Sequence, residues 1–471
     1  MRLISAFFNP IDDCDEVFNF YEPLHKLMYG NGFQTWEYSP LFALRSYAYI
    51  LLHWLPISFI PISFKLISFY TLRVCLAIVC ATCEAFFFRA IDKQLNNSIA
   101  RTYVLLSILN VALFRSSSAF INNSFSMYTV LFAYTCWFSN ALSLSVFFIA
   151  FGSLCGWIYV AVLGIPIAID IVFRRQRYID FIKWSIISGL ITLIPLTLID
   201  SYYYGKLVIT PLNHIRYNLL SKHGPTLYGT EPWTYYIING LLNFNIIYPL
   251  AIVGIILTVN QLNRPFIDIL IDRRKAAIPY TMIVSSIIIW MSLLWLQPHK
   301  EDRFVFPIYP LIILSASISI NQIENLIPRL VRLIKLKRNS VLFVRRLFLY
   351  SIIIVHALLS ISRTFAIVDG YSAPIRLLIH SNTTSIFEKS SDQHINVCIG
   401  KDWYRFPSHF LLPEKSHLVF LRSEFTGQLP KAYSHLKNAT RLIENHFNDE
   451  NKEEIDRYVS FTHFHTKHFI C

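Results

Sequence analysis

Apolar stretches long enough to cross a bilayer recur along the chain as far as about residue 370, and they constrain its fold more than any other feature. Hydrophobic residues make up 54% of the 471 residues and charged residues only 15%, whereas soluble proteins average about 25% charged residues. A helix needs roughly twenty apolar residues to span the hydrocarbon core. The chain is therefore predicted to be an all-α polytopic membrane protein.

The basic residues indicate which loops face the cytosol. The net charge is +13, but the lysines and arginines cluster in short segments between apolar stretches, at 89–101, 174–183, 264–275 and 329–346. Cytosolic loops of membrane proteins carry this excess of positive charge. A nucleic-acid-binding surface, which would gather its basic residues on one face of a domain, is disfavoured.

Placing these loops in the cytosol predicts where the chain crosses the membrane. The segment 142–173 then begins and ends in the cytosol, so we expect two short spans hinged near Gly152 to Gly156, for roughly ten transmembrane helices in all. The other predicted spans lie near residues 65–88, 101–116, 119–138, 181–200, 236–259, 278–297, 304–321 and 347–366.

Four polar regions then fall together on the side of the membrane opposite the basic loops. They are residues 10–60, 201–235, 298–303 and the tail from 367. We expect residues 1–366 to form the transmembrane region and residues 367–471 a small domain with both helices and strands. The shared face of these four regions is the predicted functional face.

The first polar region carries four carboxylates within five positions, at Asp12, Asp13, Asp15 and Glu16. Crowding beside an apolar surface separates the pKa values of neighbouring acids, so one can accept a proton while another orients a hydroxyl. A helix N-terminus with acids in its first turn is the structural alternative. Asp13-Cys14-Asp15 also has the D-x-D spacing of some divalent metal sites, a motif of low specificity.

The short run at 298–303 has the opposite character. His299, Lys300 and Arg303 offer three cationic donors, and a guanidinium can bind two oxygens of one phosphate. Ionisable groups at a membrane boundary generally serve a polar ligand, a pathway or an ion pair. An ordinary loop whose long side chains reach the headgroups is the alternative. The run favours a phosphate-binding site.

Six segments carry a resemblance to a known family. They are similar to the dolichyl-phosphate-mannose-dependent α-1,2-mannosyltransferases (glycosyltransferase family 22) that assemble the N-glycan precursor in the endoplasmic reticulum. HKEDRF alone would indicate only the wider group, which includes α-1,6 and glycosylphosphatidylinositol-anchor mannosyltransferases, while QTWEYSP, YGTEPW and the tail narrow the choice. The segments are DCDEVFNFYEPLHKLMYGNGFQTWEYSP, HGPTLYGTEPW, NGLLNFN, HKEDRFVFPIYPLI, KDWYRFPSHFLLP and SEFTGQLPK.

This resemblance implies a GT-C fold in the endoplasmic reticulum membrane, with a lumenal active site and a lumenal C-terminal domain. It implies dolichyl phosphate mannose as donor and a dolichyl-diphosphate oligosaccharide with six or eight mannoses as acceptor, with membrane lipid as surroundings and no nucleic acid partner. Because the leaving group is a single phosphate, we expect no metal and no cofactor. A β-linked donor and an α-linked product imply one inverting displacement.

The resemblance also implies roles for individual residues. Asp15 is expected to be the base, with Glu16 supporting it or orienting the acceptor, although Asp13 and Glu16 could exchange roles with it. His299, Lys300 and Arg303 are expected to hold the donor phosphate. Carboxylates and aromatic rings suit a sugar, and each of the following is otherwise a structural hydrogen-bond partner: Glu22, His25, Trp36, Glu37, Glu231 and Trp233.

A polytopic transporter or lipid scramblase is the rival function, with the same charges lining a substrate path. Transporters of this kind are often built from internal repeats, and the sequence has no such repeat. The family has a transmembrane helix ahead of the acidic region, where this chain has only MRLISAFFNPI, too short to span. We expect either a gene model that starts late or a differently inserted N-terminus.

Overall fold

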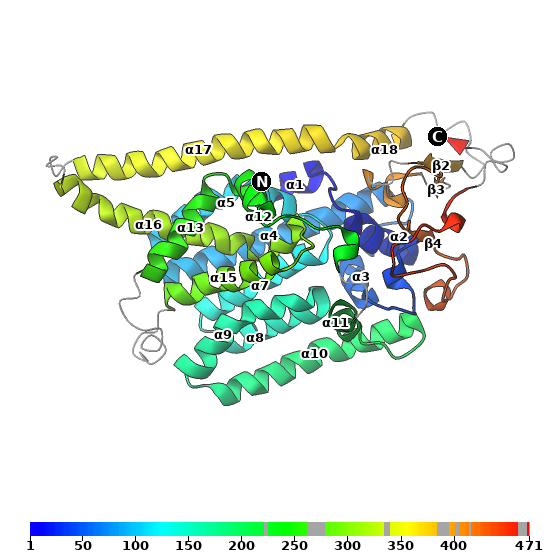
Figure 1. Ribbon diagram of the computed structural model, residues 1–471, viewed down its shortest axis with the longest axis horizontal. Helices are drawn as coiled ribbons and strands as arrows, with labels where there is room; N and C mark the ends of the chain where they lie inside the picture. Colours follow the sequence, from blue (N-terminus) through cyan, green and yellow to red (C-terminus); the bar gives the residue numbers. More distant parts are fainter. Residues whose placement is uncertain are drawn as a thin grey trace.

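The computed structural model is a bundle of long helices with a small β region at one end (Figure 1). It describes residues 1–220, 225–260, 278–333, 340–383, 395–400, 405–413, 416–459 and 469–470. The long helices run roughly along the longest axis of the molecule, and the strands lie beside α2 (Glu22–Tyr29). The predicted all-α membrane architecture with a small C-terminal region of mixed structure is confirmed.

Four described helices are long and apolar enough to cross a membrane. A fifth crossing could be formed by α12 (Tyr235–Phe244) and α13 (Ile247–Asn260), which are bent by 112° relative to each other. Shorter apolar helical segments cover Tyr47–Ile57, Leu142–Gly156 and Tyr280–Leu296. The number of ten crossings stays a prediction. The four long helices are α4 (Lys65–Gln94), α10 (Tyr178–Tyr204), α16 (Tyr309–Leu333) with the 3-10 turn Asp302–Ile308 before it, and α17 (Ser340–Tyr371).

Two predicted spans are wrong as single helices, because 236–259 is divided between α12 and α13 and 101–116 is divided as well. Residues 101–116 belong to two helices, α5 (Asn97–Ile108) and α6 (Val111–Ser116). The side chain of Asn110 accepts a hydrogen bond from the backbone N–H of Leu113 at 3.3 Å and so caps α6. Asparagine favours such caps over helix interiors, which is why the chain restarts there. Arg115 consequently lies in the last turn of a short helix of its own.

The hinge predicted near Gly152 to Gly156 is confirmed. Helix α8 (Leu142–Phe151) runs into a π-turn at Gly152–Gly156, and a 3-10 segment leads to α9 (Ile165–Ile169). A Cβ atom on Gly152 would lie 2.1 Å from Oγ1 of Thr129 on α7 (Asn122–Phe138). Glycine therefore allows the hinge to pack directly against α7.

The tail pairs with the first polar region. Strand β1 (Phe33–Gln34) is antiparallel to β4 (Lys431–Ala432), with Phe33 opposite Ala432. A separate parallel sheet has the order β3-β2-β5. Helix α17 continues past residue 366, and the division at 366/367 stays a prediction. The strands of this sheet are β2 (Ile395–Ile399), β3 (Ser416–Phe420) and β5 (Phe469–Ile470).

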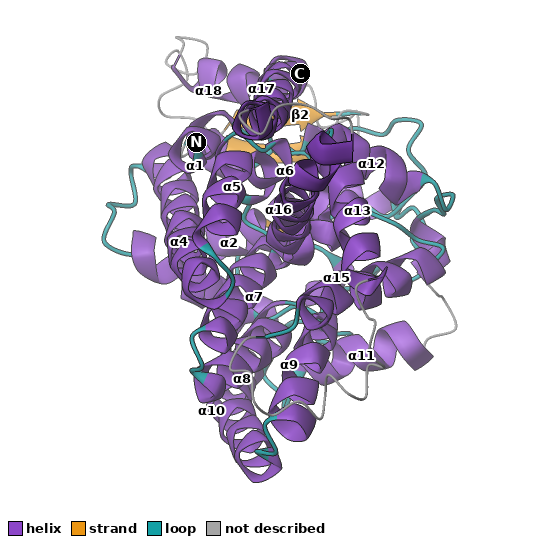
Figure 2. Ribbon diagram, turned by 90° about the vertical axis from the view of Figure 1, so that its left-hand side faces the viewer, coloured by secondary structure: helices purple, strands orange, loops and turns teal. Residues whose placement is uncertain are grey.

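The long helices differ sharply in how far they are covered. In the end-on view α16 lies among α4, α5, α7 and α13 (Figure 2). In its most apolar stretch of 18 residues, 89% is buried. Only 6% of the corresponding stretch is buried in α17 and 17% in α10, which run along opposite edges in Figure 1. Apolar helices with so little protein contact suit lipid. The remaining helices are α1 (Arg2–Phe8), α3 (Tyr47–Trp54), α11 (Thr210–Leu220), α15 (Tyr280–Leu296) and α18 (Ala373–Thr383).

Candidate active site

The acidic segment and the basic run, 288 positions apart, meet through Arg303. Its Nη1 donates to Oδ2 of Asp15 at 2.6 Å, and its Nε lies 3.1 Å from Oδ2 of Asp13. The same guanidinium contacts Glu301. Two of the polar regions that the topology placed on one face are therefore in direct contact.

A second arginine, Arg45, holds Asp15 from the other side. Its Nη2 lies 2.9 Å from Oδ2 of Asp15, and its Nε donates to Oε2 of Glu37 at 2.9 Å. Asn19 also donates to Glu37, at 2.7 Å. Burial opposes ionisation of Asp15, but Arg303 and Arg45 outweigh it and lower its pKa to about 2. Asp15 is thus a carboxylate held ionised between two arginines, and Glu37 fixes one of them.

The neighbouring acids respond in the opposite direction. Burial raises the pKa of Asp13 to about 8 in spite of Arg303. It raises the pKa of Glu16 to about 7 in spite of Arg73 and of the hydrogen bond that the Phe120 N–H donates to Glu16. Acids with pKa values pushed apart in this way are typical of sites of proton transfer.

Asp12 belongs to an adjoining ion cluster around Arg115. The Nε of Arg115 donates to Oδ2 of Asp12 at 2.9 Å, and its Nη1 contacts Asp302. Asn243 and the hydroxyl of Tyr309 donate to Asp302 at 3.1 and 3.0 Å. Sequence reasoning missed Arg115 because it placed this residue at the end of a span; the capping asparagine at position 110 was the available signal.

Residues of these two clusters line a cavity that opens to solvent, here named the charged cavity. Its lining comes from the acidic segment, α6, α12, the 3-10 turn before α16, and α17. The lining residues are Asp12, Asp13, Glu16, Arg115, Ala119, Ile121, Tyr235, Asn239, Glu301, Asp302, Arg303, Phe306, Arg363, Ile367 and Tyr371.

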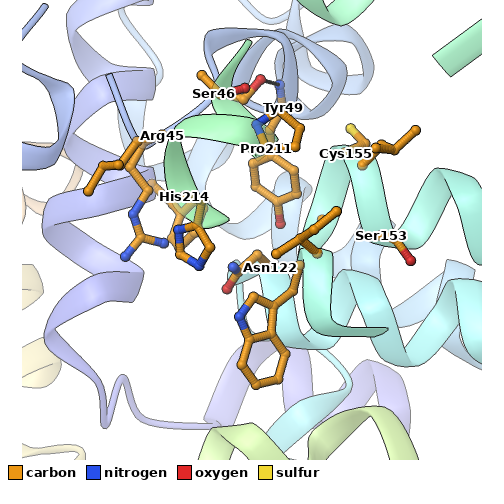
Figure 3. Close-up of a pocket in the computed structure, with 15 residues that line it drawn as sticks. Arg45, Ser46, Tyr49, Asn122, Ser153, Cys155, Pro211 and His214 are labelled. Carbon is orange, nitrogen blue, oxygen red and sulfur yellow. Dashed lines mark hydrogen bonds between the residues drawn. The ribbon is translucent and has the colours of Figure 1, made fainter. Parts of the chain in front are cut away.

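A second, smaller cavity, here named the Arg45 cavity, is shown in Figure 3. Arg45, Tyr49, Asn122 and His214 are among its lining residues. Asp15 is not itself in the lining of either cavity, but the arginines that it binds line one cavity each. A group bound in either cavity would therefore sit next to an arginine that contacts Asp15. Sequence reasoning did not find Arg45, because it follows the apolar segment SPLFAL with no charged neighbour.

Of the three predicted phosphate ligands, only Arg303 lines the charged cavity. The His299 ring lies 2.9 Å from the carbonyl of Gly229 and 3.0 Å from Oε1 of Glu301, and the hydrogen bond with Glu301 raises its pKa. The buried ammonium of Lys300 donates to the carbonyls of Glu231 and Gln297, at 3.1 and 2.5 Å. Both side chains thus fasten the loop before α12 to the basic run.

Glu22 and His25 lie in neither cavity lining. Oε2 of Glu22 is 2.6 Å from Nδ1 of His409, and Oε1 accepts from Ser408 and from the backbone of His409, at 3.0 and 2.8 Å. The Phe33 N–H completes this cluster at 3.0 Å. Nδ1 of the buried His25 pairs with the carbonyl of Asn31. Glu22, Phe33, Ser408 and His409 are here named the Glu22 knot, which ties the first polar region to the tail.

The other predicted sugar contacts lie nearer the surface. Trp36 packs on Phe42 and Tyr217, beside Glu37. Glu231 is exposed, and its N–H donates to the carbonyl of Pro298 at 3.0 Å. Trp233 is 69% exposed. Of these residues Glu231 contacts the basic run, and none of the three lines either cavity.

Side-chain ligand atoms of Asp13, Cys14 and Asp15 lie within 4.8 Å of one another, a spacing that could hold a metal ion. Both carboxylates, however, already contact Arg303. A cation would have to compete with that guanidinium for the same oxygens. The donor set therefore fits an acid–arginine cluster better than a metal site.

Comparison with known proteins relates the chain to one family. The model of the Alg9-like mannosyltransferase family covers residues 1–413. The chain is 41% identical to the mouse and human α-1,2-mannosyltransferase ALG9, over 98% of this chain and 76% of either relative. It is 32% identical to the Saccharomyces cerevisiae ALG9, over 91% of this chain and 74% of that protein.

Solved structures agree on the fold. The crystal structure of ArnT from Cupriavidus metallidurans bound to undecaprenyl phosphate superposes with a TM-score of 0.56, covering 89% of this chain and 83% of ArnT at 11% identity. ArnT is a GT-C glycosyltransferase, so the predicted fold class is confirmed. The chain belongs to the Alg9-like mannosyltransferase family.

Proposed function

We propose that the protein transfers mannose in α-1,2 linkage from dolichyl phosphate mannose to a dolichyl-diphosphate oligosaccharide carrying six or eight mannoses, at the lumenal face of the endoplasmic reticulum membrane. The relatives are named α-1,2-mannosyltransferases. The observation that carries the proposal is the contact of Arg303 with Asp13 and Asp15 at the wall of a cavity bounded by the exposed helix α17. In this contact a guanidinium, a group suited to binding phosphate, lies beside an ionised carboxylate, which supports the proposal.

The proposed reaction is a single displacement at the anomeric carbon of the donor mannose. The acceptor hydroxyl oxygen forms the new bond as the bond from C1 to the phosphate oxygen breaks, which inverts a β-linked donor to an α-linked product. The hydroxyl proton passes to a carboxylate, and the electron pair of the broken bond leaves on the phosphate. Asp15 is the proposed base, because Arg303 and Arg45 keep its carboxylate ionised at neutral pH and therefore able to accept a proton.

The other groups support this step by charge and position. Arg303 stabilises the negative charge that grows on the leaving phosphate. Glu16, in the lining of the charged cavity, orients the acceptor hydroxyl. Glu37 fixes Arg45 and through it Asp15.

The remaining predicted residues take proposed roles according to where they lie. Trp36, Glu231 and Trp233 contact sugars of the acceptor from the partly exposed surface around the basic run. His299 and Lys300 hold that run in place. Glu22 and His25, both buried, position the first polar region.

The test is transfer of radiolabelled mannose from dolichyl phosphate mannose to a synthetic six-mannose lipid acceptor by the purified protein. The expected product loses its label on digestion with an α-1,2-specific mannosidase, and a chelator leaves the rate unchanged. A product resistant to that enzyme would contradict the linkage, and a chelator-sensitive rate would contradict the metal-free mechanism. No transfer under conditions where the human relative is active would overturn the proposal.

A further inference from the structure

Helix α17 presents one stripe of side chains to the charged cavity. Arg363, Ile367 and Tyr371 all line it, and their spacing of four residues places them on one helix face. Only 6% of the most apolar window of α17 is buried, and the helix runs along one edge of the molecule (Figure 1). The helix is therefore the outer wall of the charged cavity, with lipid expected on its other side.

Arg363 differs from the other two arginines of the cavity. Arg115 and Arg303 each contact carboxylates. The Nε of Arg363 is shielded from solvent and has no hydrogen-bond partner among the described residues. Buried polar groups are nearly always paired, so a shielded guanidinium N–H at a cavity wall points to a partner supplied by a ligand.

The position of Arg363 along α17 suits a lipid headgroup. It lies eight residues before the end of the helix at Tyr371, which corresponds to about 12 Å at 1.5 Å per residue. That end of α17 adjoins the acidic segment and the basic run. A charged side chain in an apolar membrane helix generally faces a ligand or an internal pair.

Side chains of α12 that line the same cavity could donate further hydrogen bonds to a phosphate held by Arg363. Tyr235 and Asn239, four residues apart on α12, also line the cavity, and α12 packs against α17. They offer neutral hydrogen-bond donors, and a guanidinium can donate two parallel hydrogen bonds to one phosphate. The exposed apolar face of α17 would cover a hydrocarbon chain that leaves the cavity.

We propose that Arg363 binds the phosphate of a polyprenyl-type phosphate lipid in the charged cavity, with the lipid chain lying along α17. This inference rests on the proposed function, which requires such lipids as donor and acceptor. The phosphate could come from the donor phosphodiester or from the acceptor diphosphate. The two sources share the recognition chemistry and are separated by experiment.

The test uses the purified full chain with Arg363→Gln and Arg363→Lys. Arg346→Gln is the matched control, because Arg346 is exposed on the same helix at its opposite end. With saturating acceptor, Arg363→Gln is expected to raise the KM for dolichyl phosphate mannose about tenfold, with kcat reduced less. The lysine variant keeps the charge but loses the two-pronged geometry, so it is expected to lie between wild type and the glutamine variant.

Measuring the KM for the acceptor at saturating donor shows which of the two lipids supplies the phosphate that Arg363 binds. A rise confined to the donor KM assigns Arg363 to the donor phosphate, and a rise confined to the acceptor KM assigns it to the diphosphate. Unchanged values of both in Arg363→Gln would overturn the proposal, as would an equal rise in Arg346→Gln.

Binding without turnover separates this proposal from the proposed function. Dolichyl phosphate in detergent is expected to raise the unfolding temperature of the wild-type protein and of Arg346→Gln, and to raise that of Arg363→Gln much less. This pattern together with no mannose transfer by the wild type would refute the proposed function and leave the lipid-phosphate site standing. Equal stabilisation of all three proteins would refute the site.

Discussion

The first polar region builds two charged clusters with similar electrostatics and different surroundings. The pKa of Asp15 and the pKa of Glu22 are both lowered to about 2 by cationic or hydrogen-bonding partners that outweigh burial. Glu22 is fully buried, and its oxygens are occupied by groups of the Glu22 knot. Asp15 is 18% exposed, and its two arginines line two cavities. The comparison teaches that access for a ligand, more than a shifted pKa, separates a reactive acid from a structural one.

The local backbone explains how acids so close in sequence reach different places. Asp15 and Glu22 are seven positions apart and would share a face of a regular α-helix. A π-helix covers Glu16–Tyr21 between them. Because a π-helix has more residues per turn, the two side chains no longer point the same way. The π-helix therefore directs Asp15 towards Arg45 and Arg303 and Glu22 towards the tail.

The largest effect is expected from Asp15→Asn. This change removes the ionised carboxylate but keeps its volume, so kcat should fall about 1000-fold, within the range of general acid–base catalysis. Steady-state transfer from dolichyl phosphate mannose to the six-mannose acceptor measures it. A kcat within tenfold of wild type would show that Asp15 is not the base.

Glu22→Gln is expected to act on stability instead. Removing the carboxylate that accepts several buried hydrogen bonds costs about 1–3 kcal/mol, so the unfolding temperature in detergent should fall while the folded protein keeps nearly wild-type kcat. The pKa of Glu22 is lowered in the folded state, so its contribution is present at pH above its ordinary pKa and is lost as pH falls towards 2.

The gap in unfolding temperature between wild type and Glu22→Gln should therefore narrow in acid. His409→Gln is the matched control and should destabilise to a similar extent, because it removes the other half of the same pair. A gap that stays constant or widens with acidification would contradict the assigned pairing of Glu22 with His409.

Asp13→Asn tests whether Asp13 or its neighbour Asp15 is the base. Burial raises the pKa of Asp13 to about 8, so at pH 7 it holds a proton and asparagine resembles it closely. Transfer at pH 7 should stay within about tenfold of wild type, a much smaller change than for the base. Above pH 8 the wild-type carboxyl ionises in the charged cavity and should raise the KM for the anionic donor.

Asp13→Asn has no carboxyl group at position 13, so its KM for the donor should stay constant as the pH rises above 8. Measuring donor KM on both sides of pH 8 for the two proteins checks this. A larger loss of kcat at pH 7 in Asp13→Asn than in Asp15→Asn would move the role of base to Asp13.

The smallest effect is expected from Trp233→Ala. Trp233 is 69% exposed, so stability should change by less than about 0.5 kcal/mol. If the ring contacts acceptor sugars, the acceptor KM should rise a few-fold with the donor KM unchanged. Trp295→Ala, on α15 and 41% exposed, is the control and should leave both values as they are.

Part of this site could be predicted from sequence because topology alone brings distant segments to one face. The positive loops placed the acidic segment and the basic run on the same side, and Arg303 does contact Asp13 and Asp15. The fold class followed from the apolar spans, and the glycine hinge from the cytosolic position predicted for both ends of 142–173.

The rest of the site depends on where individual side chains point, which the sequence does not specify. Lys300 and Arg303 are three positions apart, yet one ammonium is buried on carbonyls and the other cation lines the charged cavity. The sequence suggested that Glu22 binds sugar, but in the structure Glu22 pairs with His409, which is 387 positions further along the chain. Arg363 escaped notice because a single arginine barely alters an apolar window.

The most direct test of the central claim is the rate of the chemical step in a single turnover. Enzyme in excess is loaded with radiolabelled dolichyl phosphate mannose and mixed with saturating acceptor, using wild type, Asp15→Asn and the folded fraction of Glu22→Gln. The account predicts a rate about 1000-fold lower for Asp15→Asn and a nearly wild-type rate for Glu22→Gln. A wild-type rate in Asp15→Asn, or a comparable loss in Glu22→Gln, would contradict the division between a reactive and a structural cluster.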